Sequence, residues 1–395
     1  MKEEKNTNQK QKIFSLSRRQ EFFLYCFVST IVFASSFFLF YKQAFIGVDL
    51  PVHIDFALNG SSYSVNSLFL RWSYKLIGGE FGCALYLAIV MVLTLFASTY
   101  LLKTCITDTG KDISFAHCFL PGTALCFIGC IFFPYLNERF YLGTYFTQPW
   151  HNSTYLLMRL FGLLTVAVYI KIRKHYLTDG ITFKEWFVFF VLLLLTNAAK
   201  PNFIIFFAPA MLCELIYDFV KTRAKKAKQI VAFGMAVLCS LPILYFQFGE
   251  LYPSEAEEPS EIFITAKYFL EFLTAKNIIS HLLTFMPFLL FVTILCIVKK
   301  CVNRNLIFGW LMFLFAYAEK WFIYESGPRL THGNFGWGLI FAGLILSIIC
   351  VERLWFLKKQ IKKPVFMSAT AILEVMLISG FLYFIIVLVT GKSLF

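Results

Sequence analysis

Charged side chains are scarce in this sequence, and acidic ones are the rarer kind. Asp, Glu, Lys and Arg together make up 15% of the 395 residues, whereas 59% of the residues are hydrophobic. Because soluble proteins are roughly 45–50% apolar, this composition excludes a chain built mainly of soluble domains. Runs of about 20 apolar residues, each able to cross a hydrocarbon layer ~30 Å thick as a helix, recur along the chain. The sequence therefore predicts an integral membrane protein.

Other signals are missing as well. The sequence has eleven cysteines but no Cys-x-x-Cys pair of the zinc-binding kind, and most of the cysteines fall inside apolar runs. They are expected to pack between helices rather than to form disulfides or bind metal. Although the net charge is +13, the lysines and arginines lie in short loops where anionic lipid headgroups account for them. Nucleic acid is not an expected partner.

The apolar runs predict an all-α fold, a polytopic transmembrane helical bundle of about eleven spans. The fifth and sixth spans are separated only by Lys200-Pro201, so they are either two short helices in a tight turn or one long helix broken by proline. The expected spans cover approximately 22–42, 81–102, 114–134, 152–171, 185–199, 202–219, 229–249, 278–298, 305–323, 334–351 and 366–390.

The distribution of lysine and arginine predicts the orientation, because short loops rich in these residues stay in the cytoplasm. Clusters within 2–19, 171–174, 221–228, 299–304 and 353–363 all fall on one face. The N-terminus is thus expected in the cytoplasm and the C-terminus outside, with the first span retained as an anchor. The expected parts are a basic tail at 1–21, one transmembrane domain at 22–395, and external loops at about 43–80, 135–151, 250–277 and 324–333.

Two external segments have the pattern of interfacial helices. Residues 64–77 are too short to span, and their apolar side chains recur at helical spacing, with Trp72 and Tyr74 suited to headgroup depth. A second amphipathic stretch, at 262–273, is expected to lie along the outer surface.

Once the orientation is set, the unusual polar residues gather on the external side, whereas the inner loops carry mainly lysines. Ionisable residues of this kind usually have a function in a membrane protein. The candidate catalytic residues are Asp49, His53 and Asp55. The candidate substrate-binding residues are Glu138, Arg139, His151, Asn152, Arg159, Lys200, Asn202, Glu325, Arg329, His332 and Asn334.

The first group follows the first span directly. In a partly dry pocket Asp49 has the properties of a general base, because burial raises the pKa of a carboxyl group towards a useful value. His53 is a candidate to assist it or to bind phosphate, and Asp55 to orient an acceptor sugar or hold a divalent cation. The alternative is that these are solvated loop residues or a helix N-cap.

Two basic residues are candidate phosphate ligands. Arg159 lies inside an apolar run, where an unpaired charge is costly, and its guanidinium is suited to grip phosphate at two points; the alternative is that it snorkels to the headgroups. Lys200 sits where the chain breaks between two spans, and irregular backbone at such depth needs protein or water beside it. It is either a second phosphate contact or an ordinary loop lysine.

The segment 324–338 combines an acid, a base, an imidazole and an amide among glycines, which allow close approach of the backbone to a ligand. Arg329 is expected to grip a phosphate leaving group, with Glu325 fixing its guanidinium and His332 and Asn334 meeting sugar hydroxyls. A turn closed by an ion pair between Glu325 and Arg329 is the alternative.

This arrangement resembles the GT-C class of membrane glycosyltransferases. The shared features are the acids Asp49 and Asp55 in the first external loop, the interfacial helix after them, about eleven spans, and basic residues at outer helix ends. The two acids are more widely spaced than in the common Asp-x-Asp form, and no large soluble C-terminal domain follows. The resemblance implies that Asp49 is the catalytic base and that the sugar arrives on a polyprenyl phosphate.

The expected reaction is an inverting transfer to a glycan or glycolipid of the cell envelope, on the external face of a bacterial inner membrane. Its partners are this donor, the acceptor and membrane lipids; no cofactor is assigned, and a divalent cation is left open. One rival is an O-antigen or capsule polymerase, which would depend on Arg139 and Arg329 and tolerate loss of Asp49. Another is a non-enzymatic flippase, which needs a polar path to the inner face.

Overall fold

The computed structural model describes residues 17–46, 49–60, 63–133, 135, 150–252, 260–330 and 333–391, which are almost entirely helical. The longer helices are α1 (Arg18–Ile46), α4 (Gly79–Asp108), α6 (Ser153–Arg173), α7 (Phe183–Ala199), α8 (Asn202–Lys221), α14 (Arg304–Phe322), α15 (Trp337–Leu357) and α16 (Lys363–Thr390). The shorter ones are α2 (Asp49–Asn59), α3 (Val65–Ser73), α5 (Phe115–Leu125), α9 (Ala227–Ser240), α10 (Pro242–Leu251), α11 (Lys267–Phe272), α12 (Ala275–Thr284) and α13 (Pro287–Val298). A π-helix (Tyr74–Gly78), two 3₁₀ turns (Gly327–Arg329 and Asn334–Gly336) and strands β1 (Ile262–Ile264) and β2 (Ile323–Glu325) complete them.

The helices confirm a membrane-embedded, nearly all-α protein, but not the count of eleven spans. Among the described residues seven helical stretches are long and apolar enough to cross a membrane, and α12 with α13 makes an eighth if this pair, bent by 74°, is one span. Helices α7 and α14 stand at the expected positions without meeting that test. The fifth and sixth expected spans are two separate helices, because α7 ends at Ala199 and α8 begins at Asn202.

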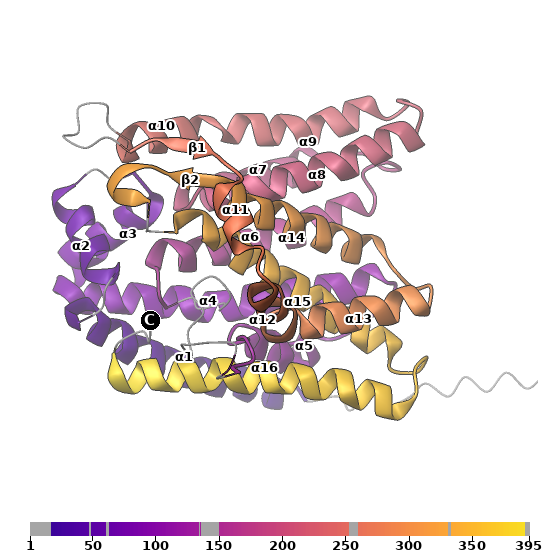
Figure 1. Ribbon diagram of the computed structural model, residues 1–395, viewed down its shortest axis with the longest axis horizontal. Coiled ribbons are helices and arrows are strands. Elements are labelled where there is room, and N and C mark those ends of the chain that lie inside the picture. Colours follow the sequence, from indigo (N-terminus) through magenta and orange to yellow (C-terminus); the bar gives the residue numbers. More distant parts are fainter. Residues whose placement is uncertain are drawn as a thin grey trace, which may run out of the picture.

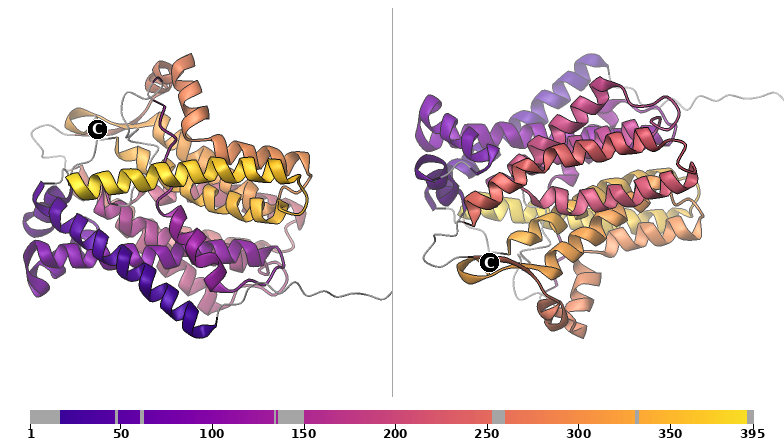
Figure 2. Two further views of the ribbon diagram at one scale, coloured as in Figure 1. Left: turned by 90° about the horizontal axis from the view of Figure 1, so that it is seen from below. Right: turned by 90° about the horizontal axis from the view of Figure 1, so that it is seen from above.

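The long helices run roughly along the longest axis of the molecule, with α2, α3 and the β1–β2 pair towards one end (Figure 1). Helices α6 and α15 are the most enclosed of the spans, whereas α1 and α16 expose much of their apolar surface, which is suited to lipid. Figure 2 shows α11 and α12 standing out from the side of this bundle. The last turns of α1 and α16, which are far apart in the sequence, meet where Lys42 Nζ donates to the carbonyl oxygen of Val389, 2.5 Å away.

The prediction of a spanning helix over 114–134 is wrong beyond its first half. Helix α5 has 11 residues, about 17 Å at ~1.5 Å per residue, and residues 126–133 are not helical. The unwound chain exchanges its helical bonds for tertiary ones: the amide of Gly129 donates to Met376 O (3.0 Å) and that of Ile131 to Thr284 O (2.9 Å). Close packing permits this, since a Cβ added at Gly380 would lie 1.8 Å from Phe127 O.

The external segments differ from their predictions in instructive ways. Residues 49–59, expected in a loop, form helix α2. Helix α3 with the π-turn confirms a helix over most of 64–77; it buries polar Asn66 and Ser67 inward and leaves Trp72 and Leu76 exposed. The helix predicted over 262–273 is wrong at its start, because residues 262–264 form β1 and pair antiparallel with β2. All eleven cysteines lie in the part of the chain that the structure describes, and none of them forms a disulfide.

Candidate functional site at one end of the bundle

Helix α2 begins at Asp49, and the start of α6 lies beside it. The Nδ2 of Asn152 donates to Asp49 Oδ2 over 3.1 Å. Asn152 is also the N-cap of α6, since its Oδ1 accepts from the amide of Tyr155 at 3.0 Å. One asparagine therefore joins two helix N-termini, whose dipoles favour a negative charge. Asp49 Oδ1 makes no hydrogen bond with a described residue, so this oxygen is available to a substrate.

His53 lies one helical turn after Asp49 and on the same face of α2. Its Nδ1 is 2.7 Å from the hydroxyl of Ser153. Burial lowers the pKa of His53 to about 4, although the charge of Asp49 opposes this shift. Asp55 is on another face: it is exposed, and its Oδ1 accepts from Asn59 Nδ2 at 2.8 Å. The structure thus groups Asp49 with His53 and leaves Asp55 outside.

Lys200 is the C-cap of α7. Together with Asp49, His53, Glu325 and Arg329 it belongs to the polar cluster at this end of the bundle. Its Nζ donates to the hydroxyl of Thr154 (3.3 Å) and lies over the ring of Trp337, 5.6 Å from the centroid. Burial lowers the pKa of Lys200 to about 8, while Asp49 and Glu325 act to raise it. A lysine held by an aromatic ring and a hydroxyl keeps its charge available for an anion.

Arg329 is fixed by the carboxylate of Glu325, which is almost completely buried. The ion pair between Arg329 Nε and Glu325 Oε1 measures 2.8 Å, and Arg329 Nη1 also donates to Leu251 O at 3.1 Å. Glu325 accepts further bonds from the Tyr252 hydroxyl (2.5 Å) and from Asn334 Nδ2 (2.7 Å). Its oxygens are therefore occupied by protein groups, which makes Glu325 a residue that positions Arg329 and Asn334.

A second buried carboxyl group lies behind Lys200. The Nδ2 of Asn202 donates to Glu319 Oε1 over 2.5 Å and to Asn334 O over 3.0 Å. Glu319 packs against Gly338, where an added Cβ would lie 2.1 Å from its Oε2. Asn202 and Glu319 thus connect the start of α8 to the segment that carries Arg329.

Electrostatic contacts join the two halves of the site. The charges of Asp49, Glu325 and Arg329 all act on Lys200. Tyr63 connects them from the other side: burial raises the pKa of its hydroxyl, Arg329 lowers it, and Asp49 raises it. Asp49 of α2 and the cations of the α7–α8 and α14–α15 connections therefore occupy one region.

The remaining predicted residues lie at the edge of this region, elsewhere in the molecule, or outside the described residues. Arg159 is fully buried in α6 and its Nη2 donates to Cys126 O (2.9 Å), in the unwound segment after α5. The ring of His151 lies 5.7 Å from that of Trp337, at the edge of the cluster. Glu138, Arg139 and His332 lie outside the described residues.

Sequence reasoning missed Glu319, Tyr252, Tyr63 and Ser153. Only Glu319 carried a signal, as an ionisable residue near the end of an apolar run. The roles of the other three come from contacts between segments distant in the sequence.

The described residues do not bring together three or more His, Cys, Asp or Glu side chains able to hold a metal ion. Asp49 and Asp55 in particular lie on different faces of α2, so they do not form a chelate. A metal-binding role for Asp55 gains no support from this geometry.

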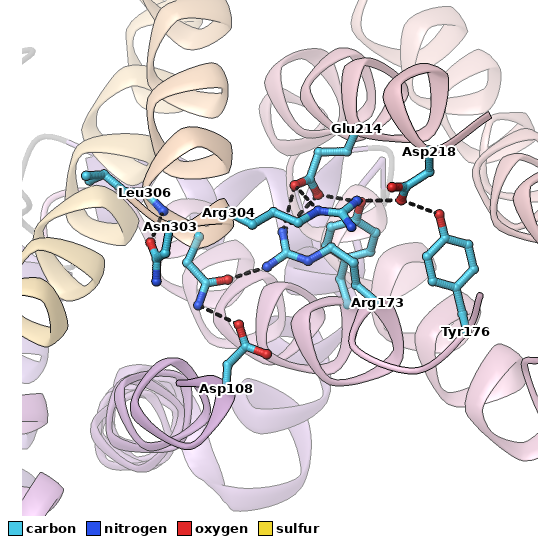
Figure 3. A network of polar contacts seen from close by, with 10 residues as sticks. Asp108, Arg173, Tyr176, Glu214, Asp218, Asn303, Arg304 and Leu306 are labelled. Carbon is cyan, nitrogen blue, oxygen red and sulfur yellow. Dashed lines mark hydrogen bonds and ion pairs between the residues drawn. The ribbon is translucent and has the colours of Figure 1, made fainter. Parts of the chain in front are cut away.

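A second polar cluster occupies the opposite end of α6, α8 and α14 (Figure 3). Glu214 forms ion pairs with Arg173 (2.8 Å) and with Arg304 (2.9 Å), and Arg304 forms a further ion pair with Asp218 (2.6 Å). Glu214 and Asp218 therefore belong to a local ion-pair network. Its members neutralise one another, as buried charges must, which indicates a structural role.

The first cluster, in contrast, has a carboxylate oxygen, a histidine edge and a lysine that are not used up by protein partners. Such a set is suited to bind a substrate with hydroxyl groups and a negative charge, and to move a proton at Asp49 Oδ1. Comparisons of the chain with protein-family models, with curated proteins and with solved structures give no match.

Proposed function

We propose that this protein is a membrane glycosyltransferase that moves a sugar from a polyprenyl-phosphate donor to a glycan or glycolipid acceptor. One observation carries the proposal: Asp49, with one oxygen open, shares a region at a single end of the bundle with Lys200 and Arg329. A base facing fixed cations is what displacement of a phosphate by a hydroxyl requires. The likeness to GT-C enzymes supports the same reading.

The residues divide the reaction between them. Asp49 Oδ1 takes the proton of the acceptor hydroxyl as its oxygen bonds to the anomeric carbon. The bond from that carbon to the phosphate oxygen breaks, and Lys200 and Arg329 stabilise the departing lipid phosphate. Glu325 keeps the guanidinium in place from behind. Fixed cations at a developing negative charge supply several kcal/mol in enzymes, about 3–4 kcal/mol for one donor.

The proposed topology places this end outside a bacterial inner membrane and the N-terminus in the cytoplasm. Seven helical stretches are long and apolar enough to cross. The proposed count of eleven adds α7, α14, the bent α12–α13 pair, and α5 together with the unwound chain after it as the third span. The ion-pair network of Figure 3 then lies at the cytoplasmic end, among the basic loops.

The test is sugar transfer from polyprenyl-phosphate donors by purified full-length variants. Asp49→Asn keeps the bond from Asn152 but removes the base, so kcat is expected to fall about 10²–10⁴-fold. Asp55→Asn, on the same helix but outside the cluster, is the matched control and is expected to keep the wild-type rate. Thermal unfolding of both variants checks that they are folded.

Arg329→Lys tests the phosphate side, because lysine keeps the charge but cannot bond Glu325 and Leu251 O in the same way. We expect weaker donor binding together with a lower kcat. Full activity of Asp49→Asn alongside loss of activity in Arg329→Lys contradicts the proposed base and favours a polymerase that depends on arginine.

A further inference from the structure

His53 is held by a chain of hydrogen bonds that has a direction. The hydroxyl of Tyr86 donates to Asn66 Oδ1 over 3.0 Å, and Asn66 Nδ2 donates to Ser153 Oγ over 2.9 Å. Ser153 Oγ is in turn 2.7 Å from His53 Nδ1. These residues come from α4, α3, α6 and α2, so the chain fixes the ring by four separate elements.

Counting protons along this chain sets the tautomer of the ring. A serine hydroxyl has one proton to donate. Ser153 accepts from Asn66 and is buried, and among the described residues the only group in reach to accept its proton is His53 Nδ1. Because a buried hydroxyl proton without an acceptor is costly, the Ser153 proton goes to His53 Nδ1. Nδ1 is then the acceptor, and the proton of the neutral ring is on Nε2.

The surroundings keep the ring neutral. Burial lowers the pKa of His53 to about 4; the charge of Asp49 works against this, and Lys200 and His151 add to it. At neutral pH the ring therefore has a single proton. Nε2 makes no hydrogen bond with a described residue, and the side chain is only partly buried.

The donor and the open acceptor lie together. Asp49 and His53 are four residues apart on α2, which places their Cβ atoms about 5–6 Å apart on one face. Neighbouring hydroxyl groups of a sugar offer this combination in reverse, one as donor and the next as acceptor.

We propose that His53 is a substrate-binding hydrogen-bond donor. Its Nε2–H donates to one hydroxyl oxygen of the acceptor sugar, and Asp49 deprotonates the adjacent hydroxyl group. The substrate class is then an acceptor sugar with two adjacent hydroxyl groups. The ligand identity rests on the proposed function, whereas the tautomer does not. His53 itself takes no proton in this arrangement.

The first experiment needs no enzymatic activity. Full-length protein with ¹⁵N-labelled histidine is studied by NMR in detergent at pH 7, and the His53 signals are identified by their loss in His53→Gln. We expect a neutral ring with a protonated Nε2 and an unprotonated Nδ1. Ser153→Ala should mix the two tautomers because it removes the proton donated to Nδ1. A ring protonated on Nδ1, or on both nitrogens, overturns the proposal.

The second experiment compares two amides in the transfer assay. Glutamine places an NH₂ group near the position of Nε2, whereas asparagine reaches only that of Nδ1. We expect the acceptor KM of His53→Asn to be about tenfold higher than that of His53→Gln, with a small difference in kcat, since tenfold equals ~1.4 kcal/mol. For wild type, an acceptor that lacks the adjacent hydroxyl should have a higher KM than the complete acceptor. For His53→Asn, the two acceptors should have the same KM. Equal loss of kcat in both variants overturns the donor role.

The two outcomes separate the inference from the function it rests on. A protonated Nε2 without sugar transfer from any donor refutes the glycosyltransferase and leaves the tautomer standing. Sugar transfer by a protein whose His53 is protonated on Nδ1 supports the enzyme and refutes the inference.

Discussion

Lys200 is subject to opposing influences at the scale of a single residue. Burial takes its ammonium group out of water, while Asp49 and Glu325 favour the charged form, and the result is a pKa of about 8. The ordinary value for lysine is ~10.4, so Lys200 changes charge at a pH where other lysines stay charged. As the pH rises, Lys200 therefore loses a bound anion at a lower pH than a surface lysine would.

This property predicts a pH dependence. Binding of the phosphate donor by wild type should weaken as the pH rises through about 8, because Lys200 loses its charge there. Lys200→Arg should abolish this loss, since a guanidinium stays protonated. The measurement is the donor KM between pH 6.5 and 9.5, and an unchanged profile in Lys200→Arg contradicts the assignment.

The effect on stability has the opposite sign. The native state binds fewer protons than the unfolded state between the two pKa values, so the Lys200 contribution to the free energy of unfolding rises with pH from about 8 to about 10.5. Chemical unfolding of wild type against Lys200→Met isolates this contribution. The free energy of unfolding of wild type minus that of Lys200→Met should rise over this interval, and a fall in this quantity contradicts the assignment.

Three of the candidate residues that occupy one region share one trait. Asp49, Lys200 and Arg329 are charged residues beside predicted span ends, and the predicted orientation puts all three on the same side of the membrane. It cannot separate Asp49 from Asp55, because that distinction depends on α2 being a helix and on which of its faces meets α6. Whether these residues carry out sugar transfer stays a prediction.

At the scale of elements, the segment after α5 shows what an apolar pattern does not reveal. Hydropathy over 114–134 is that of a span, yet the chain unwinds after Leu125 because distant groups replace its helical hydrogen bonds. One of them is Arg159, whose guanidinium meets Cys126 O; Ser379 Oγ is another, at 2.5 Å from Cys130 O. Irregular backbone at membrane depth needs such partners, and none of them is near in sequence.

The contact between α14 and α15 predicts the result of one substitution. In Gly338→Ala the new methyl group would lie 2.1 Å from the Glu319 carboxylate, so the two helices or the side chain must shift. We expect a loss of about 1–3 kcal/mol in the free energy of unfolding, the usual cost of overpacking. Unfolding in detergent measures it, and the transfer rate should fall because Glu319 holds Asn202.

Gly234→Ala in α9 is the matched control for that substitution. Nothing lies within 4 Å of a Cβ added there, so the same change should leave the protein as stable as wild type or more so, by ~0.5–1 kcal/mol. Glu319→Ala in the Gly338→Ala background should recover part of the loss if the clash is the cause. Independent, additive losses from the two changes would refute it.

For the whole molecule, the meaningful pattern is that the two ends of the bundle differ. At one end the charges of Figure 3 satisfy one another, with Arg173 and Arg304 against Glu214 and Asp218. At the other end the charge of Asp49 acts on Lys200, but these two described residues do not form an ion pair. Loops rich in lysine accompany the end with the ion-pair network, and the positive-inside rule predicts that such loops lie in the cytoplasm.

This asymmetry predicts which residues a membrane-impermeant maleimide reaches in intact cells. Asn59, exposed at the end of α2, lies at the proposed external end, and Lys225, exposed after α8, at the basic end. Asn59→Cys should be labelled in intact cells and Lys225→Cys only after permeabilisation. Wild type supplies the background, because its exposed cysteines, Cys26, Cys213 and Cys239, lie within α1, α8 and α9. The reverse labelling would put Asp49 on the cytoplasmic side, where a donor carried by lipid to the outer face never meets it, and would refute the proposed reaction on topology alone.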